Sequence, residues 1–405
     1  MRVLILSTSE RAGGAAIAAS RLCRALNNHG VHAMMLVRDK QTDNINVARV
    51  RVGRWPFLWE RLRILVANGL SRRNLWATDI ACAGGDITST DEFRQADVIH
   101  LHWVNQGFLS LKELDKILHC GKRVVWTLHD QWPTVGVCHY SAACDHYPSG
   151  CRRCPQMKGT LPRKVFEKKR DCYETAILTF VGCSQWIARL AAQSPLTKGH
   201  RVVSVPNALP QDIFQPMHQQ TARMAHNLPL DMRLILFSAF KVTDERKGFR
   251  YLVEALADVQ RTSIPIALVV VGQQAEGLHR QLSSAMAGSE NVFCIPYVAD
   301  ERQMASLYAA VDVFVTPSLQ DNLPNTIAEA MSVGTPCVGF EVGGIPEMID
   351  HKENGYVARY CDAHDLAEGI VYCLTHDLRA EAAQKAAVTY SEGSVARKYI
   401  ELYEC

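Results

Sequence analysis

One stretch near the C-terminal end, residues 316–347, constrains the fold more than any other part of the chain. An apolar run, 311–315, precedes it and is typical of a buried parallel strand. After a polar loop, a helix is predicted over 325–333, and Gly334 follows it as a helix-ending glycine. A second apolar strand, 337–340, runs into a pair of glycines. This order predicts a βαβ unit with polar residues at the strand ends, where open α/β sheets bind ligands.

Two carboxylates in this stretch are candidates for ligand binding. Asp321 lies on the loop, and Glu329 follows eight residues later in the predicted helix. The free backbone N–H groups near Asn325 and Thr326 suit an anionic phosphate, and the carboxylates can accept hydrogen bonds from ribose or sugar hydroxyls. In the alternative interpretation, Asp321 only stabilises the start of the helix and Glu329 is a solvated helix residue. The spacing alone leaves both interpretations open.

The motif around these carboxylates resembles a known family. The motif begins with an acidic residue, followed after seven residues by Glu-Ala-Met, then by G-x-P and G-G-x-x-E. This pattern is similar to that of the retaining family-4 (group 1) glycosyltransferases. The resemblance covers most of the chain and implies an α/β protein of GT-B architecture, in which two Rossmann-like doubly wound domains face a cleft. It implies a catalytic sugar contact for Asp321, where the family usually has the longer Glu. It also implies donor contacts for Asn322, Leu323, Asn325, Thr326 and Glu329.

Composition narrows the class of protein. A chain of 405 residues predicts two or three domains, and 48% hydrophobic with 21% charged residues is ordinary for a globular protein. The net charge of +3 is too small to indicate a nucleic acid partner. The sequence contains no apolar run of about 18 residues, so no transmembrane helix is predicted. We interpret the N-terminus as a first core strand rather than a signal peptide. The fourteen cysteines are mostly scattered in apolar segments, so we expect reduced thiols and a cytoplasmic location.

The N-terminal segment has the order strand, glycine turn, helix. An apolar strand over 3–7 is followed by Gly13 and Gly14 and then by an alanine-rich helix that ends near His29. This is the geometry of a phosphate-binding loop, although close helix packing would also explain two adjacent glycines. The family resemblance implies that the backbone at Gly14 approaches the donor diphosphate and the acceptor.

Two further buried strands, predicted over 96–102 and 124–130, carry histidines at their C-terminal ends. We interpret His100 as structural. The family has a histidine at the T-x-H-D position, which implies that His129 lies near the donor sugar and supports the reaction by binding substrate rather than by abstracting a proton. The resemblance places His102 and Asp130 on the acceptor side, where Asp130 either orients His129 or binds acceptor.

Residues 51–79 alternate aromatic and aliphatic side chains with arginines. Such a stretch can lie on an anionic membrane face. It can equally form a pair of helices packed on the domain with solvated arginines, and we favour this packing. Lipid-linked acceptors, which are common for glycosyltransferases of this kind, keep the membrane alternative open. A second basic run, 164–170, is interpreted as the solvated face of a helix.

A cysteine-rich insert follows the T-x-H-D motif. Cys138, Cys144, Cys151 and Cys154 have the spacing C-x5-C-x6-C-x2-C, which indicates a structural zinc site. A redox pair and plain packing are the alternatives. The insert would fix the loop beside His129 and shape the acceptor side. The colanic-acid type of exopolysaccharide glycosyltransferase carries a similar loop, which narrows the resemblance in that direction.

The domain boundary is predicted after a P-N-A turn that resembles the family's P-N-G. Residues 1–208 form the N-terminal, acceptor-side domain with the insert 138–155, and 209–385 form the donor domain. The remaining helix, 386–405, is expected to cross back to the first domain, as such tails often do in GT-B proteins.

Two lysines follow the first predicted strand of the donor domain. Lys247 precedes a glycine in a K-G motif, and the resemblance implies that it pairs with the donor's phosphates and takes part in catalysis. Lys241 stands where the family commonly has arginine, so it can neutralise diphosphate but lacks the bidentate guanidinium. Solvated loop lysines are the alternative.

Together these features predict a retaining transferase that moves a hexose from a nucleotide diphosphate sugar to a glycan hydroxyl. We expect a lipid-linked acceptor in exopolysaccharide, capsule or O-antigen synthesis, with peripheral contact at the inner membrane face. No cofactor is expected for catalysis, because GT-B members usually need no metal there. The alternatives are a non-transferase GT-B enzyme, such as a nucleotide-sugar epimerase, and a degenerate nucleotide-sugar-binding subunit.

Overall fold

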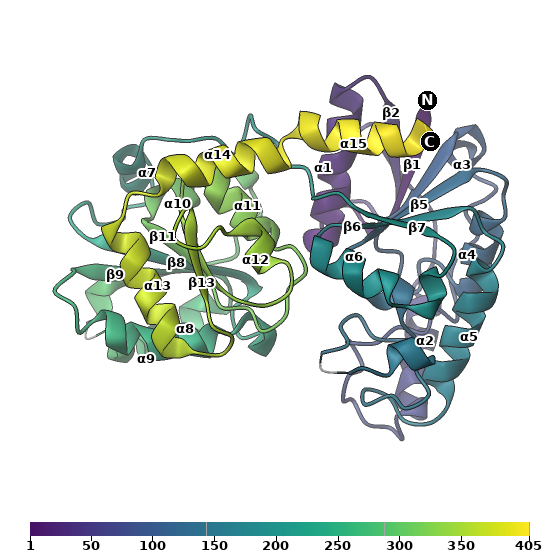
Figure 1. Ribbon diagram of the computed structural model, residues 1–405, viewed down its shortest axis with the longest axis horizontal. Coiled ribbons are helices and arrows are strands. Elements are labelled where there is room, and N and C mark those ends of the chain that lie inside the picture. The colour runs from purple at the N-terminus through teal and green to yellow at the C-terminus, as the bar shows by residue number, and fades with distance from the viewer. Residues whose placement is uncertain (143, 287, 405) are drawn as a thin grey trace. The chain divides into compact units, whose positions relative to one another are not determined.

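The computed structural model describes residues 1–142, 144–286 and 288–404 (Figure 1). The chain divides into two compact units between Ala208 and Leu209. Unit 1 comprises residues 1–208 together with the chain from Val395 on, and unit 2 comprises Leu209–Ser394. The predicted terminal helix 386–405 is therefore divided between the units, because a break near Ser391 separates two helices.

Unit 1 contains a seven-stranded, fully parallel sheet with the strand order β3-β2-β1-β4-β5-β6-β7. Its elements are β1 (Arg2–Ser9), α1 (Gly14–Asn28), β2 (His32–Asp39), β3 (Val47–Arg49), α2 (Trp55–Ala67), α3 (Asp91–Gln95), β4 (Val98–Leu101), α4 (Leu111–Leu118), β5 (Arg123–Leu128), α5 (Leu161–Tyr173), β6 (Leu178–Gly182), α6 (Gln185–Ala192), β7 (Arg201–Ser204) and α15 (Glu392–Glu404).

Unit 2 contains a six-stranded parallel sheet with the order β10-β9-β8-β11-β12-β13. Its elements are α7 (Gln219–Ala225), β8 (Arg233–Lys241), α8 (Phe249–Val259), β9 (Ile266–Gln273), α9 (Ala275–Ala285), β10 (Val292–Ile295), α10 (Glu301–Ala310), β11 (Val313–Thr316), α11 (Asn325–Ser332), β12 (Cys337–Phe340), α12 (Ile345–Met348), β13 (Gly355–Ala358), α13 (Ala363–Thr375) and α14 (Arg379–Tyr390). Figure 1 shows α8, α9 and α13 on one face of this sheet and α7, α10, α11 and α14 on the other.

Both sheets are Rossmann-like, because each is all-parallel and its strand order reverses beside the first strand. Alternate residues of each strand enter different cores. In β1, Leu4 and Leu6 pack with α4, α5 and α6, whereas Val3 and Ile5 pack with α1 and α15. Apolar residues on both faces explain why the strands appear in the sequence as continuous apolar runs.

The C-terminal helix α15 is an integral part of unit 1. It lies beside α1 in Figure 1, and its buried side chains include Val395, Tyr399 and Tyr403. The Tyr403 hydroxyl lies 2.6 Å from His100 Nδ1, and the Tyr399 hydroxyl lies 2.8 Å from Thr127 Oγ1. The last helix therefore completes the core of the unit formed by the first half of the chain.

Helix α2 does not pack as the sequence suggested. Its inward face carries Glu60, Arg61 and Ile64, whereas Trp55 is 69% and Leu58 is 54% exposed. The inward polar groups have partners: Arg61 ion-pairs with Asp79, and the backbone N–H groups of residues 80 and 81 donate to Glu60 Oε1. The preferred interpretation, a pair of helices packed on the domain with solvated arginines, therefore fails in two respects: residues 68–79 form no second helix, and Arg61 is buried.

The basic run 164–170 also differs from the expectation at one residue. Lys169 on α5 is fully buried, and its ammonium donates to the carbonyl oxygens of Trp132, Val135 and Gly136 at 2.5–2.9 Å. Its Nζ lies 3.5 Å from the centroid of the Trp132 ring, a cation–π distance. The solvated-face interpretation therefore fails at Lys169.

Removing the Tyr399 side chain should destabilise unit 1. We expect Tyr399→Ala to cost about 3–5 kcal/mol, because it leaves a cavity and deletes the bond to Thr127. All seven tryptophans lie in unit 1, so urea unfolding followed by tryptophan fluorescence reports on that unit. Glu401→Ala, at an exposed position of the same helix, is the matched control. A loss below about 1 kcal/mol would contradict the docking of α15.

Candidate functional site

The strand order of unit 2 reverses between β8 and β11, and the loops after these two strands meet. The first loop contains a short 3-10 turn, Glu245–Lys247, and Gly248 follows with φ +67°. A Cβ on Gly248 would stand 1.8 Å from the carbonyl oxygen of Pro317, so only glycine allows the loops to approach this closely. Backbone bonding continues the contact, since Leu319 N–H donates to Arg246 O at 2.8 Å.

Asp321 lies at the centre of this junction. Its Oδ2 accepts from Lys247 Nζ at 2.6 Å and from Ser318 Oγ at 3.4 Å. Burial alone would raise the pKa of Asp321, but the Lys247 ammonium and the Arg246 guanidinium outweigh it and lower the pKa from 3.8. The loop after β12 also reaches Asp321, because the Gly344 N–H of that loop donates to the backbone carbonyl of Asp321 at 3.3 Å. Two residues implied as catalytic, Lys247 and Asp321, are therefore in direct contact.

The other residues implied in donor binding lie on or beside α11. Asn322 and Leu323 are buried in the loop, and Asn325 and Thr326 form the half-buried first turn of the helix. Glu329 is only 7% exposed, and its Oε2 accepts from the Tyr308 hydroxyl at 3.2 Å. The alternative that Glu329 is a solvated helix residue is therefore wrong.

Arg246 was not singled out from the sequence. Its Nη1 donates to Gln320 O at 2.9 Å and lies 3.9 Å from Asp321 Oδ2. Lys241 is exposed at the end of β8. The Arg246 guanidinium is therefore a third cation in this part of unit 2, in addition to Lys241 and Lys247. The signal was present in the run D-E-R-K-G, where an arginine immediately precedes the K-G motif.

In unit 1, the strand ends of β4 and β5 bring two histidines together. His102 Nδ1 lies 2.8 Å from His129 Nε2, and the rings stack with centroids 5.0 Å apart. Burial lowers the pKa of His129 to about 4, against a raising effect of Asp130, and it holds the pKa of His102 well below 6.5. Both imidazoles are therefore neutral near pH 7. The ring nitrogens of His100 hydrogen-bond to the hydroxyl groups of Thr127 and Tyr403, which agrees with the structural role expected for this residue.

Asp130 is held by three donors. Trp103 Nε1 and Trp132 N–H each donate at 2.9 Å, and His139 Nδ1 lies 2.7 Å from Oδ2. His139 Nε2 lies 2.6 Å from Asp79, so this ring bridges two carboxylates. Burial would lower the pKa of His139, but Asp130 and Asp79 outweigh it and raise the pKa to about 10. The sequence had not assigned a role to His139 or Trp103.

The glycine turn of unit 1 is at the end of β1. Gly13 has φ +91° and precedes α1, and Gly14 is the exposed first residue of that helix. Open space surrounds the Cβ position of Gly13, so a backbone conformation that favours glycine, rather than close packing, explains its presence.

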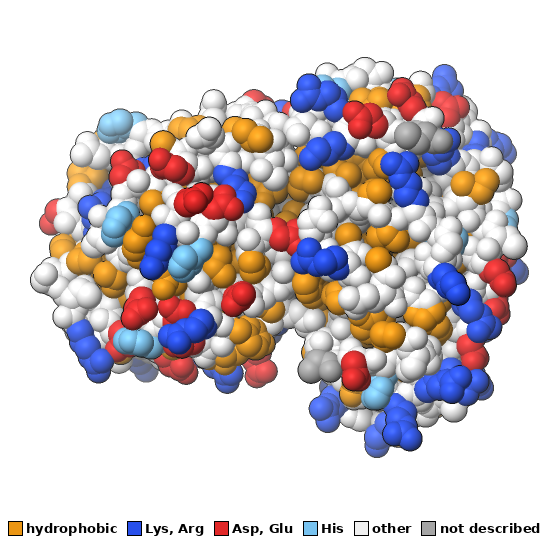
Figure 2. All heavy atoms as spheres, viewed as in Figure 1, with side chains coloured by type: hydrophobic (Ala, Val, Ile, Leu, Met, Phe, Trp, Pro, Cys, Tyr) orange, Lys and Arg blue, Asp and Glu red, His pale blue; other side chains and the backbone are white. Residues whose placement is uncertain are grey.

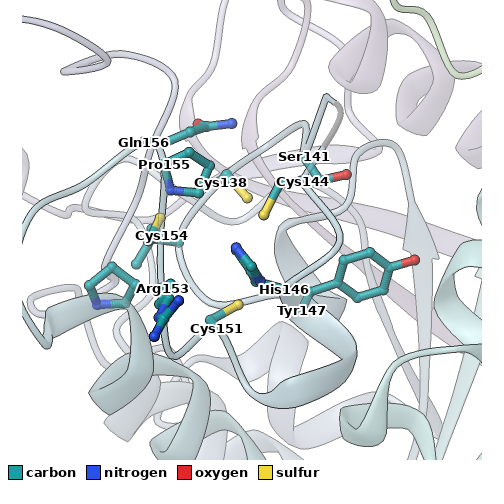
Figure 3. Close-up of a pocket in the computed structure, with 12 residues that line it drawn as sticks. Cys138, Ser141, Cys144, His146, Tyr147, Cys151, Arg153, Cys154, Pro155 and Gln156 are labelled. Atoms are coloured by element: carbon teal, nitrogen blue, oxygen red, sulfur yellow. The ribbon is translucent and has the colours of Figure 1, made fainter.

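The four cysteines of the insert line one pocket together with His146 and Tyr147 (Figure 3). All four are free thiols; Cys138 and Cys151 are buried, and Cys144 and Cys154 are half-buried. Within the described residues, no three His, Cys, Asp or Glu side chains lie at the spacing of a ready-made metal site. The structure thus places the four cysteines that were predicted to bind zinc at one pocket, without a closed ligand set.

Comparison with known proteins bears on the class of the chain. Residues 232–376 match the family model described as glycosyl transferases group 1. The chain carries a group 1 glycosyltransferase domain. The family resemblance inferred from the sequence and the enzyme class that it implies, a glycosyltransferase, are thereby confirmed.

Similarity to individual glycosyltransferases extends beyond that domain. WcaC of Escherichia coli (strain K12), named for colanic acid biosynthesis, is 23% identical over 76% of each chain. A D-inositol 3-phosphate glycosyltransferase of Corynebacterium aurimucosum is 24% identical over 94% of this chain and 87% of its own. The structure of Anabaena HepE, in complex with UDP and glucose, has a TM-score of 0.65, 16% identity and coverage of 100% and 99%. The predicted α/β fold with two Rossmann-like sheets of the GT-B kind is confirmed.

His129 should remain neutral well into the acid range. Its folded pKa of about 4 lies below the ordinary 6.5, so between these values the unfolded chain binds more protons and the free energy of unfolding falls as pH drops. Two-dimensional 15N NMR of the imidazoles between pH 7 and 4.5 checks this. His364, whose pKa is raised by Asp258, provides the internal contrast as a ring that stays charged to higher pH. An imidazolium spectrum for His129 at pH 6 would contradict the prediction.

Proposed function

We propose that this glycosyltransferase moves a hexose from a nucleotide diphosphate sugar to a hydroxyl of a glycan acceptor with retention of configuration. The observation that carries the proposal is the contact between Lys247 and Asp321 where the strand order of unit 2 reverses. A cation suited to diphosphate and a carboxylate suited to sugar hydroxyls stand 2.6 Å apart there. In the complex with a donor, the Lys247 ammonium would pair with the diphosphate, and the Asp321 carboxylate would accept hydrogen bonds from the sugar hydroxyls.

The charges of this site support stabilisation of the leaving group. As the bond between the anomeric carbon and the diphosphate breaks, negative charge grows on the nucleoside diphosphate. Lys241, Lys247 and Arg246 supply positive charge, and the N–H groups at Asn325 and Thr326 supply the positive end of α11. The acceptor oxygen forms the new bond to the anomeric carbon, and its proton goes to a phosphate oxygen of the leaving group.

The histidines of unit 1 support a substrate-binding role rather than a basic one. A neutral imidazole whose pKa is about 4 is a weak base at neutral pH, so His129 suits hydrogen bonding to the donor sugar. We assign His102 and Asp130 to the acceptor side, where Asp130 acts through the ordered rings of Trp103 and His139. The backbone at Gly14 is assigned to the diphosphate.

Removing either partner of the central pair should abolish most of the activity. We expect Lys247→Met and Asp321→Asn each to lower kcat/KM by about 100-fold or more, because each deletes a charge that acts on the donor. Release of nucleoside diphosphate from UDP-, GDP- and ADP-sugars, with membrane lipid extract as acceptor source, measures this. UDP-glucose is the first donor to test, since the structurally similar HepE binds it.

Arg261→Gln is the matched control, because Arg261 is an exposed cation beyond the C-terminal end of α8. Thermal unfolding of each variant separates loss of function from loss of fold. Failure of the wild-type chain to bind or turn over any nucleotide sugar would overturn the proposal, and so would full activity of the Lys247 variant.

The α2 surface supports a lipid-linked acceptor. We define this surface as the exposed apolar side chains of residues 55–76 with their neighbouring exposed arginines, namely Trp55, Leu58, Trp59, Leu62, Val66, Leu70, Trp76, Arg51, Arg54, Arg63, Arg72 and Arg73. Glu60 is the only acidic residue between 51 and 77, and it is buried. Figure 2 shows further Lys and Arg side chains over the part of unit 1 that carries α2 and α5 in Figure 1.

Exposed tryptophans with arginines, and without an exposed carboxylate, match an anionic lipid surface. Within the described residues, no helix has the length and apolar character needed to cross a bilayer. We therefore propose peripheral contact through the α2 surface. A lipid-linked glycan, as used in polysaccharide synthesis, would be reached there, and the name of the similar WcaC agrees with such a role.

Vesicle binding tests the α2 surface. Each arginine near an anionic membrane contributes about 1 kcal/mol, so we expect Arg54→Ala with Arg72→Ala to weaken binding to phosphatidylglycerol vesicles about 30-fold. Arg163→Ala with Arg170→Ala, on the exposed face of α5, removes the same charge and is the control. Cosedimentation at constant ionic strength gives the affinities. An equal loss of vesicle affinity in both double variants, or no vesicle binding by the wild-type chain, would contradict a specific membrane-binding face.

A further inference from the structure

The insert between β5 and α5 gathers four thiols around one pocket. The pocket holds about 330 Å³ of empty space, part of it open to solvent, and its walls include Cys138, Cys144, Cys151 and Cys154. Figure 3 shows the thiols on different sides of this space, with the His146 ring between them. The thiols of Cys144, Cys151 and Cys154 each interact electrostatically with Cys138, so the four groups lie within range of one another.

Backbone N–H groups are directed at two of the sulfur atoms. Gly136 N–H donates to Cys151 Sγ at 3.3 Å, and the N–H groups of Gln156 and Met157 hydrogen-bond to the Cys154 thiol. The position of Gly136 is specific, since a Cβ there would stand 3.2 Å from Cys151 Sγ and 2.7 Å from the carbonyl oxygen of Pro162. Sulfur accepts such bonds far better as thiolate than as thiol, because the charge strengthens them.

A buried cation lies beside the same sulfurs. The Lys169 ammonium is fully buried, and its three hydrogen bonds all go to neutral backbone carbonyls. Asp79 and Asp130 also act on it, but both are already engaged by His139, and Asp79 by Arg61 as well. The thiols of Cys138 and Cys151 interact with the same ammonium. Burial lowers the pKa of Lys169 to about 7, and negative charge on these neighbouring sulfurs would stabilise its ammonium form.

We propose that Cys138, Cys144, Cys151 and Cys154 bind one zinc ion as thiolates. Four thiols release four protons to solvent and form a tetrahedral centre of net charge −2, with no oxidation or reduction. Lys169 offsets part of that charge. Four sulfur ligands suit zinc, and a site without an open position is structural.

Closure of the site requires only local movement. All four cysteines line the pocket; Cys138 and Cys151 are buried, whereas Cys144 and Cys154 are half-buried. We infer that these last two side chains rotate towards the ion, which explains why the described thiols surround the pocket without reaching coordination distance.

The centre would stabilise the acceptor side of unit 1. Cys138 is followed directly by His139, which bridges Asp130 and Asp79. The zinc ion would therefore stabilise the segment that positions Asp130. Zinc binding would not depend on the donor or on the reaction.

Metal content of the wild-type chain tests the proposal without any activity assay. The protein is purified without chelator, or reduced and refilled with Zn²⁺ under anaerobic conditions. We expect about one zinc per chain by mass spectrometry, and a sulfur-only first shell at about 2.3 Å by X-ray absorption. Mercurial titration of the native protein should release that zinc as the four thiols react.

Matched variants locate the ligands. Cys144→Ser with Cys154→Ser should lose the zinc, whereas Cys120→Ser with Cys172→Ser, two half-buried cysteines elsewhere in unit 1, should retain it. His146→Ala should also retain it, because the proposal assigns all four ligand positions to the cysteines, although His146 lines the same pocket. Less than about a tenth of a zinc ion per refilled wild-type chain would overturn the proposal. Disulfides among the four cysteines in freshly isolated protein, or a nitrogen ligand in the first shell, would overturn it as well.

Discussion

The ion pair between Lys247 and Asp321 fixes the loops on which the donor-side chemistry depends. Because the Asp321 carboxylate is buried, loss of Lys247 would leave a charge with poor solvation, so the loop conformations that keep the two groups together are favoured. Glycines make the contact sterically possible. Gly248 admits the carbonyl of Pro317, and Gly343, with φ +63°, admits the carbonyl of Asp321 at a distance no Cβ could tolerate. Three loops from neighbouring strands thus converge on one residue, Asp321.

The sequence predicted the part of the site that is local. The βαβ unit over 316–347 formed as expected because apolar runs, a helix-ending glycine and a glycine pair lie within about thirty residues, and each constrains only its neighbours. The K-G motif was recognised for the same reason. Its contact with Asp321, 74 residues away, was not visible, since the loop conformations that bring them together arise from strand order rather than from spacing.

The failures share a different physical cause. In α2, Trp55, Leu58 and Trp59 lie on one exposed face, and sequence spacing alone does not say which face of a helix points inward. The answer came from Arg61 and Asp79, whose ion pair satisfies a polar inner face. Lys169 was misassigned because a lysine within a basic run is usually solvated, and here three carbonyls and a tryptophan ring surround its ammonium. Side-chain burial depends on partners that are remote in sequence.

The inward face of α2 also explains how Asp130 keeps its position. Glu60 and Arg61 contact Asp79 or its neighbours, Asp79 contacts His139, and His139 contacts Asp130. Two cations, Arg61 and protonated His139, balance the two aspartates. Burial and the charge of Asp79 raise the pKa of Glu60 to about 7, against Arg61, so this carboxyl adds only part of a charge near neutral pH.

A buried chain of this kind is stable only while every member is paired, because one missing partner would leave an uncompensated charge in the interior. The polar inner face of α2 is thus required by the site. The apolar residues of the opposite face of α2, among them Trp55, Leu58 and Trp59, are exposed and contribute the helical part of the α2 surface. The polar contacts that order Asp130 therefore also determine which face of α2 is available for the proposed membrane contact.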